Sequence, residues 1–262
     1  MVEAVVWQSI VIAAMLAIGF GVAAFRLATI PRPNYAILVK LYPKSVLLLL
    51  LRILTLLLFV AVFVVSLNRS NFHDMVYYTY WNFTIQTIYV LAAIIHQLAT
   101  WSQPRPVHAN QVLNVLWDVA FPSCILVVGV YWGVLYTPAK VIPWTTYVVH
   151  GGNLGLLFLE FAFNEYLIQR NNLKFVVMWP ALYGAVTWIT MATGLNSVWP
   201  YDLLDVSKPL APLKWFGIVA GHVVAFGVAL LLSSAKLRLV PAPPEDNKNG
   251  NPIVAKTLID FV

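Results

Sequence analysis

Seven long apolar stretches constrain this chain more than any other feature of its sequence. An α-helix needs about 20 mostly apolar residues to cross the hydrocarbon core of a bilayer. Apolar residues make up 61% of the 262-residue chain and charged residues only 10%, whereas a soluble domain is roughly half apolar and about a quarter charged. We therefore predict an all-α, polytopic transmembrane bundle of about seven helices. The stretches are Ala4–Phe25, Val46–Leu67, Met75–Leu98, Val112–Tyr136, Pro143–Leu167, Phe175–Leu195 and Leu213–Ser234.

Two of these stretches carry residues that are unusual in a membrane span. Arg52 lies near one end of the second stretch, so we expect its side chain to snorkel toward the interface. Pro180 and Gly184 are expected to interrupt the sixth stretch.

The sequence as a whole predicts a single membrane domain followed by a tail. Residues 1–238 form the expected helical bundle, and residues 239–262 form a polar, Pro-rich tail that we expect to be disordered and cytosolic. The first stretch lacks a basic n-region and is as long as a full span, so we expect it to remain as a helix rather than act as a signal peptide. The one cysteine, Cys124, allows neither an intrachain disulfide nor a Cys-based metal cluster.

The distribution of Lys and Arg predicts the orientation, because these residues concentrate in cytoplasmic loops. One set of loops, together with the C-terminal tail, carries eleven of them, and the opposite set carries four. We therefore predict an integral protein of the endomembrane system or plasma membrane, with a lumenal or outside N-terminus and a cytosolic C-terminus. The same rule explains the formal net charge of +6, so nucleic acid is not an expected partner. The eleven are Arg26, Arg32, Lys40, Lys44, Arg105, Arg170, Lys174, Lys236, Arg238, Lys248 and Lys256, and the four are Arg69, Lys140, Lys208 and Lys214.

Polar residues within the spans form two patterned groups. Such residues are costly in hydrocarbon and each needs a reason to be there. An α-helix rises about 1.5 Å per residue along its axis, so the position of a residue within its span gives its expected depth in the membrane. By this measure the polar residues fall into an outer and an inner layer. The outer layer comprises Thr79, Asn82, His150, Asn153 and His222, with Gln86 on the same helix face as Thr79; the inner layer comprises Asn114, Asp118 and Glu160.

The outer layer contains the elements of a nucleophile–base pair. His150 could take the proton of the Thr79 hydroxyl as that hydroxyl attacks a carbonyl. Asn82 or Asn153 could then stabilise the oxyanion. The alternative is that these side chains only join helices through hydrogen bonds. In the inner layer, Asp118 and Glu160 are expected to form a structural or proton-sharing pair.

Other kinds of chemistry find no support in the sequence. It contains no Gly-x-Ser-x-Gly elbow, no His-Glu-x-x-His motif and no phosphate-binding loop. His96 is expected at the opposite membrane face from His150 and His222, so a shared zinc site is not expected. We therefore expect no metal and no cofactor.

Short motifs around these residues resemble the androgen-induced membrane protein family. The stretch Tyr78-Thr79-Tyr-Trp-Asn-Phe83, followed by Gln86, is similar to the Thr-containing helix of that family, and His150 is followed ten residues later by the acid Glu160. Members are multi-pass hydrolases of fatty acid esters of hydroxy fatty acids that use an intramembrane Thr and a His. The resemblance therefore implies that Thr79 is the nucleophile and His150 the base. Further matching residues are Ala120-Phe-Pro122, Trp132, Tyr136 and Pro143.

A second resemblance is to multi-pass proteins of plants and protists, and more loosely to the rolling stone proteins. It is carried by Trp199-Pro-Tyr-Asp-Leu-Leu-Asp205-Val-Ser-Lys-Pro-Leu-Ala-Pro212, by His150-x-x-Asn153 and by His222. The two resemblances together cover about residues 70–235. The chain departs from the androgen-induced enzymes at Thr137-Pro-Ala-Lys140, which lacks their acidic pair, and in having two spans before Thr79 instead of one.

Three functions are compatible with these features. The first is an intramembrane lipid ester hydrolase, whose partners would be membrane lipids that include its ester substrate. The second is a non-catalytic scaffold, receptor or fusion factor of the rolling stone type. The third is a transporter or proton pathway in which Asp118, Glu160 and the outer histidines line a route.

Overall fold

The computed structural model describes residues 2–29, 45–103, 110–138 and 141–239 of the chain, and these residues contain helices and no strand. Short 3-10 turns, η1 (His73–Val76) and η4 (Arg170–Asn172), precede two of the helices, and π-helical segments, η2 (Tyr131–Leu135) and η3 (Val148–Gly152), follow two others. The α-helices are α1 (Val2–Thr29), α2 (Val46–Ser70), α3 (Tyr78–Ala99), α4 (Gln111–Val130), α5 (Trp144–Tyr147), α6 (Asn153–Phe163), α7 (Leu173–Ala192) and α8 (Ala211–Arg238).

Six helical segments in the described part of the chain are long and apolar enough to cross a membrane. They contain α1, α2, α3, α4 continued by η2, α7 and α8, and they confirm the prediction of an all-α polytopic bundle. The fifth predicted stretch is helical but broken, because η3 separates α5 from α6 around His150. Pro180 does not interrupt the sixth stretch, since α7 runs through it unbroken; that expectation was wrong. The predicted tail, apart from Leu239, lies outside the described residues.

Local sequence signals explain where several helices begin and end. The Ser45 hydroxyl accepts a hydrogen bond from the Leu48 amide at the start of α2, and the Asn110 side chain caps α4 in the same way. These are favoured N-cap residues because their side chains satisfy amides that have no acceptor within the helix. Asn71 ends α2 in the left-handed conformation, with φ of 49°.

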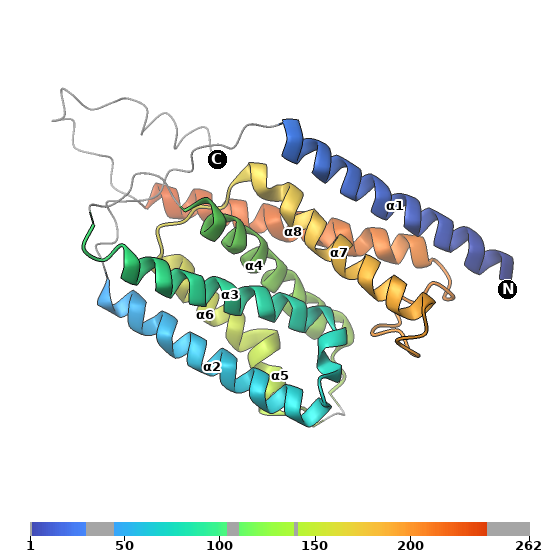
Figure 1. Cartoon of the computed structure of the whole chain (residues 1–262), viewed down its shortest axis with the longest axis horizontal. Helices are drawn as coiled ribbons and strands as arrows, with labels where there is room; N and C mark the ends of the chain where they lie inside the picture. Colours follow the sequence, from blue (N-terminus) through green and yellow to red (C-terminus); the bar gives the residue numbers. More distant parts are fainter. Residues whose placement is uncertain (1, 30–44, 104–109, 139–140, 240–262) are drawn as a thin grey trace.

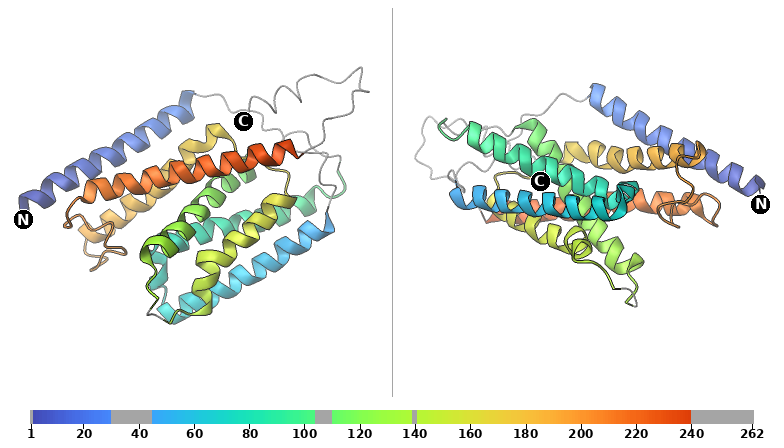
Figure 2. Two further views of the ribbon diagram at one scale, coloured as in Figure 1. Left: turned by 180° about the vertical axis from the view of Figure 1, so that it is seen from behind. Right: turned by 60° about the horizontal axis from the view of Figure 1, so that its bottom comes forward.

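α4 forms the centre of the bundle (Figure 1). It contacts α3, α6, α7 and α8, while α1 packs on α7 and α8, and α2 packs on α3 and α6. Figure 2 shows the same two groups of helices from behind and from below. In the most apolar window of α4, 61% of residues are buried, against 11% for α1. α4 therefore joins the two halves of the bundle.

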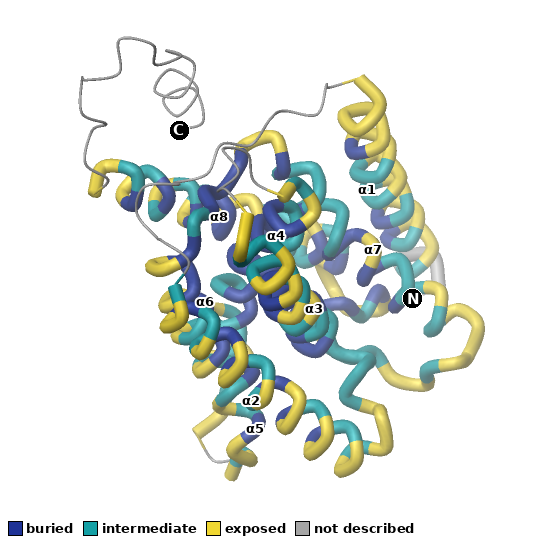
Figure 3. Tube along the Cα trace, turned by 60° about the vertical axis from the view of Figure 1, so that its left-hand side comes forward, coloured by how far each residue is buried: buried dark blue, intermediate teal, exposed yellow. Residues whose placement is uncertain are grey.

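The peripheral helices have exposed outer faces (Figure 3), and many of the exposed residues are large and apolar. On α2, for example, Leu47, Leu54 and Leu57 are each more than 60% exposed. Contiguous apolar surface of this kind indicates contact with a membrane or a partner rather than with water. Together with the lengths of the helices, this pattern fits lipid as the solvent of the bundle.

Close approach of α7 and α8 depends on one glycine. A Cβ built on Gly184 would lie 2.7 Å from the ring of Trp215. Since real Cβ atoms do not approach that closely, only glycine lets Trp215 pack against α7 at this point.

A buried ionic network links α2, α3 and α6 at one end of the bundle. Arg52 Nη2 lies 2.6 Å from Glu160 Oε1, and Arg52 Nε donates to both oxygens of the same carboxylate at 3.1 Å. The Tyr89 hydroxyl also donates to Glu160 at 2.7 Å, and Arg52 Nη1 donates to the Gln97 side chain at 2.8 Å. The expectation that Arg52 snorkels was wrong: its guanidinium is buried because Glu160, on another helix, compensates its charge.

Asp118 has a separate set of partners. Its Oδ2 accepts hydrogen bonds from Asn114 Nδ2 at 3.0 Å, from Asn172 Nδ2 at 2.7 Å and from the Gln169 amide at 3.0 Å. The expected Asp118–Glu160 pair was therefore wrong. Each carboxylate is held by its own donors: Asp118 joins α4 to the start of α7, and Glu160 joins α6 to α2 and α3.

Breaking the Arg52–Glu160 pair on one side is expected to destabilise the fold strongly. Arg52→Met leaves the Glu160 charge buried without its cation, which typically costs about 3–5 kcal/mol. The double variant Arg52→Met with Glu160→Leu removes both charges and is expected to recover most of the loss. Thermal unfolding of the purified protein in detergent measures all three proteins.

The matched control is Arg69→Met, on the same helix. The Arg69 side chain is 46% exposed and lies 3.8 Å from Asp74, so its loss should cost at most about 1 kcal/mol. An Arg52→Met protein as stable as the Arg69→Met control would show that the network does not support the fold.

Candidate functional site

The Thr79 hydroxyl and the His150 imidazole meet between α3 and η3. Thr79 Oγ1 lies 3.2 Å from His150 Nε2. Thr79 occupies the first turn of α3, and His150 lies in the π-helical segment η3. The structure thus brings together the two residues that the sequence predicted as nucleophile and base.

The second ring nitrogen of His150 determines which atom donates in this pair. His150 Nδ1 lies 3.0 Å from the carbonyl oxygen of Thr146, one turn earlier. A carbonyl can only accept, so Nδ1 carries the proton and a neutral ring has a free lone pair at Nε2. Thr79 therefore donates its hydroxyl proton to Nε2, which is the direction that general-base catalysis requires.

The backbone around His150 departs from a regular helix. His150 has φ of −119° and ψ of 17°, and η3 replaces the α-helical hydrogen bonds between residues 148 and 152. Single π-helical turns of this kind occur frequently at functional sites. The irregular turn directs the imidazole toward α3.

Two residues of a second π-helical segment, η2, contact His150. The Tyr131 ring stacks on the His150 ring with centroids 3.6 Å apart and planes 17° apart. The Trp132 indole donates a hydrogen bond to the His150 carbonyl. The ring is therefore fixed by stacking, by the Thr146 carbonyl and by Thr79.

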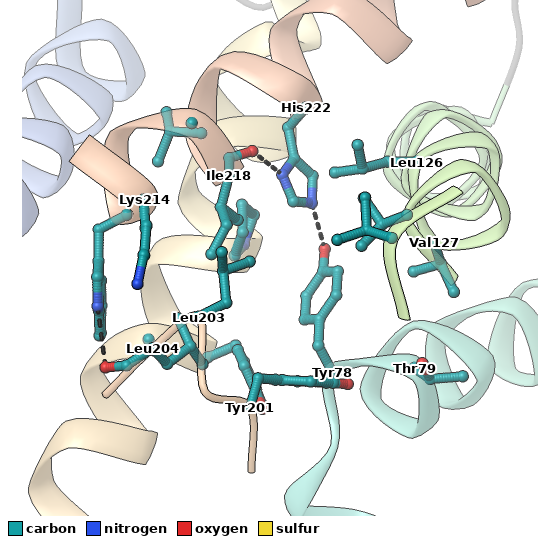
Figure 4. Close-up of a pocket in the computed structure, with 18 of the residues that line it drawn as sticks. Tyr78, Thr79, Leu126, Val127, Tyr201, Leu203, Leu204, Lys214, Ile218 and His222 are labelled. Carbon is teal, nitrogen blue, oxygen red and sulfur yellow. Dashed lines mark hydrogen bonds between the residues drawn. The ribbon is translucent and has the colours of Figure 1, made fainter. Parts of the chain in front are cut away.

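Thr79 also borders a largely apolar cavity of about 300 Å³. Residues of α1, α3, α4, η2, α7 and α8, with the segment between α7 and α8, line this cavity; Thr79 is among the lining residues and His150 is not. Thr79 therefore both lines the cavity and bonds a histidine that is not part of the lining. Figure 4 shows the lining around Tyr78, Thr79, Tyr201, Lys214 and His222.

A second hydroxyl–imidazole pair lines the same cavity. The Tyr78 hydroxyl lies 2.8 Å from His222 Nε2, and His222 Nδ1 lies 2.8 Å from the Ile218 carbonyl. By the argument used for His150, Tyr78 is the donor and His222 the acceptor. His222, predicted in the outer layer, therefore bonds Tyr78 and not Thr79 (Figure 4).

The predicted amide residues lie apart from the cavity. Asn153 Nδ2 donates to Gln86 Oε1 at 3.1 Å, which joins α6 to α3. Both side-chain polar atoms of Asn82 are buried without a hydrogen-bond partner in the described structure. None of these three residues is among those lining the cavity. The inner-layer residues Asp118 and Glu160 have the separate partners described above.

The sequence reasoning assigned no role to several residues of the site. Tyr131 and Trp132 support His150, Tyr78 bonds His222, and Tyr201 lines the cavity. Tyr78, Trp132 and Tyr201 all belong to the motifs that carry the two family resemblances. Their place in those motifs is the sequence signal that could have identified them as site residues. No group of three or more His, Cys, Asp or Glu residues that could hold a metal ion occurs in the part of the chain that the structure describes.

Comparisons of the chain with protein-family models, curated proteins and solved structures find no match.

Proposed function

We propose that this chain is an intramembrane lipid ester hydrolase in which Thr79 is the nucleophile and His150 the general base. The observation that carries the proposal is the hydrogen bond from the Thr79 hydroxyl to an imidazole whose other nitrogen is held by the Thr146 carbonyl. A hydroxyl is a weak nucleophile until an adjacent base takes its proton. In this arrangement the base is oriented before any substrate arrives.

The apolar lining of the cavity favours a lipid as the substrate. It is lined mostly by apolar side chains, and Thr79 contributes a reactive group to its wall. Pockets that bind small molecules combine an apolar lining with a few placed polar groups. The resemblance to the androgen-induced enzymes makes fatty acid esters of hydroxy fatty acids the first substrates to test.

The alternative is a non-catalytic multi-pass protein of the rolling stone type. It is favoured by the Asn153–Gln86 hydrogen bond, which joins two helices with no catalytic role, and by the burial of the Thr79 side chain, which is 8% exposed. In that case the Thr79–His150 hydrogen bond would also serve only to join α3 to η3.

Removal of either member of the pair should abolish reaction with a fluorophosphonate probe. These probes trap an activated hydroxyl, so Thr79→Ala should show no labelling and His150→Ala a loss of at least about 100-fold. Gel fluorescence of purified protein measures the labelling, and size-exclusion profiles check the fold. Thr84→Ala is the matched control, because the Thr84 hydroxyl donates to the Tyr80 carbonyl within α3. Full labelling of Thr79→Ala would rule out the hydrolase and favour the alternative.

Filling the cavity should alter chain-length preference. Ile218 lines the cavity from α8, so Ile218→Trp reduces the space for an acyl chain. We expect the ratio of long-chain to short-chain ester hydrolysis, measured with 4-methylumbelliferyl palmitate and butyrate, to fall at least about tenfold, or roughly 1.4 kcal/mol. Ile88→Trp is the control, since Ile88 is 50% exposed on the outer face of α3. An unchanged ratio in Ile218→Trp would exclude this cavity as the acyl site.

A further inference from the structure

Tyr201 is a cavity residue that is not one of the two members of the Thr79–His150 hydrogen bond. It lies in the segment between α7 and α8 and lines the cavity together with Thr79. Its ring packs edge-to-face against Tyr77, with centroids 5.5 Å apart. Figure 4 shows the Tyr201 side chain running across the cavity toward Tyr78 and Thr79.

The segment that carries Tyr201 is fixed at several points. The Leu204 amide donates to the Tyr201 carbonyl at 2.9 Å, and Trp215 Nε1 donates to the Leu204 carbonyl at 3.1 Å. Gln8, on α1, donates to the Val206 carbonyl at 3.2 Å and accepts from the Ala211 amide at 3.0 Å. Tyr201 is therefore held in place before a ligand enters, which is a requirement for electrostatic stabilisation of a transition state.

Tyr201 presents a neutral hydroxyl at physiological pH. Burial raises the pKa of this phenol to about 12, although hydrogen bonding with the Thr79 side chain and with the backbone of Thr79 and Tyr78 opposes the shift. The group therefore keeps its proton and can donate. Its neighbours, Tyr78 and Thr79, are the first two residues of α3, and the amides at a helix N-terminus favour negative charge nearby.

We propose that the Tyr201 hydroxyl is the oxyanion donor of this site, binding the negative oxygen that forms when Thr79 attacks an ester carbonyl. This inference rests on the proposed hydrolase function. It assigns to Tyr201 the role that the sequence gave to Asn82 or Asn153, neither of which lines the cavity. The Tyr78 hydroxyl is already donated to His222, whereas the Tyr201 hydroxyl bonds Thr79 and the start of α3, next to the residue that would attack the ester carbonyl.

The reaction balances without a further reagent except water. The Thr79 oxygen forms a bond to the carbonyl carbon as its proton moves to His150 Nε2, and the carbonyl π electrons move to the oxygen that Tyr201 binds. Collapse of this intermediate breaks the ester C–O bond, and His150 returns the proton to the leaving alcohol. Water then attacks the acyl-Thr79 ester, with His150 as base, and releases the acid and the free Thr79 hydroxyl.

The test is Tyr201→Phe, which keeps the ring and its packing on Tyr77 but removes the donor. We expect kcat for 4-methylumbelliferyl butyrate to fall about 100- to 1,000-fold, the usual effect of losing one oxyanion donor, while KM changes less than about threefold because the ground state makes little use of the bond. The rate of fluorophosphonate labelling should fall in parallel. Tyr80→Phe is the matched control: Tyr80 is buried next to Thr79 in α3, but does not line the cavity.

The outcomes separate this inference from the proposed function. Wild-type protein that neither hydrolyses the ester nor reacts with the probe would overturn both. Active wild type and an inactive Thr79→Ala protein, with kcat of Tyr201→Phe within about threefold of wild type, would overturn the oxyanion role alone. An equal loss of kcat in Tyr80→Phe, or a rise in KM that accounts for the whole Tyr201→Phe effect, would assign Tyr201 a structural or binding role and also overturn the inference.

Discussion

The fold depends on the requirement that polar groups within an apolar environment find partners on neighbouring helices. The Arg52–Glu160 pair is the strongest case, because three hydrogen bonds join a guanidinium on α2 to a carboxylate on α6. Tyr89 and Gln97 extend it to α3. An unpaired buried charge would be costly, so the pair favours the register of α2 and α6 that brings its two side chains together.

The same requirement shapes the candidate site at the other end of the bundle. Thr79 and Tyr78 are consecutive residues at the start of α3, and each hydroxyl reaches a histidine on a different element. In both pairs a helix carbonyl holds Nδ1 and leaves Nε2 to accept. The pairs differ at the cavity: His222 is among the residues that line it, and His150 is not. Thr79 is thus the residue that both lines the cavity and bonds a histidine outside its lining.

The sequence predicted the parts of this structure that depend on residues close together in the chain. Apolar length alone identified the six segments that are long and apolar enough to cross a membrane, but not the break in the fifth predicted stretch. The periodicity of α3 placed Thr79, Asn82 and Gln86 on one face. It could not predict partners contributed by other helices, so Arg52 was expected to snorkel and Asp118 to pair with Glu160. The break at His150 was equally out of reach, because η3 contains no proline and its His150 contacts Tyr131 and Trp132, which come from another segment. Tyr201 lay within a recognised motif, but only the fold brings it beside Thr79. The orientation across the membrane, and a transport role for Asp118, Glu160 and the outer histidines, stay predictions.

If Thr79 is an activated nucleophile, the site of covalent modification by a hydroxyl-directed probe should reveal it. Purified wild-type protein is treated with a fluorophosphonate, digested, and analysed by tandem mass spectrometry for the residue that carries the phosphonyl group. We expect a single adduct on the Thr79 oxygen, formed much more slowly when His150 is replaced by alanine. An adduct on another hydroxyl, or none on a folded protein, would contradict it and leave the Thr79–His150 hydrogen bond as a link between two helices.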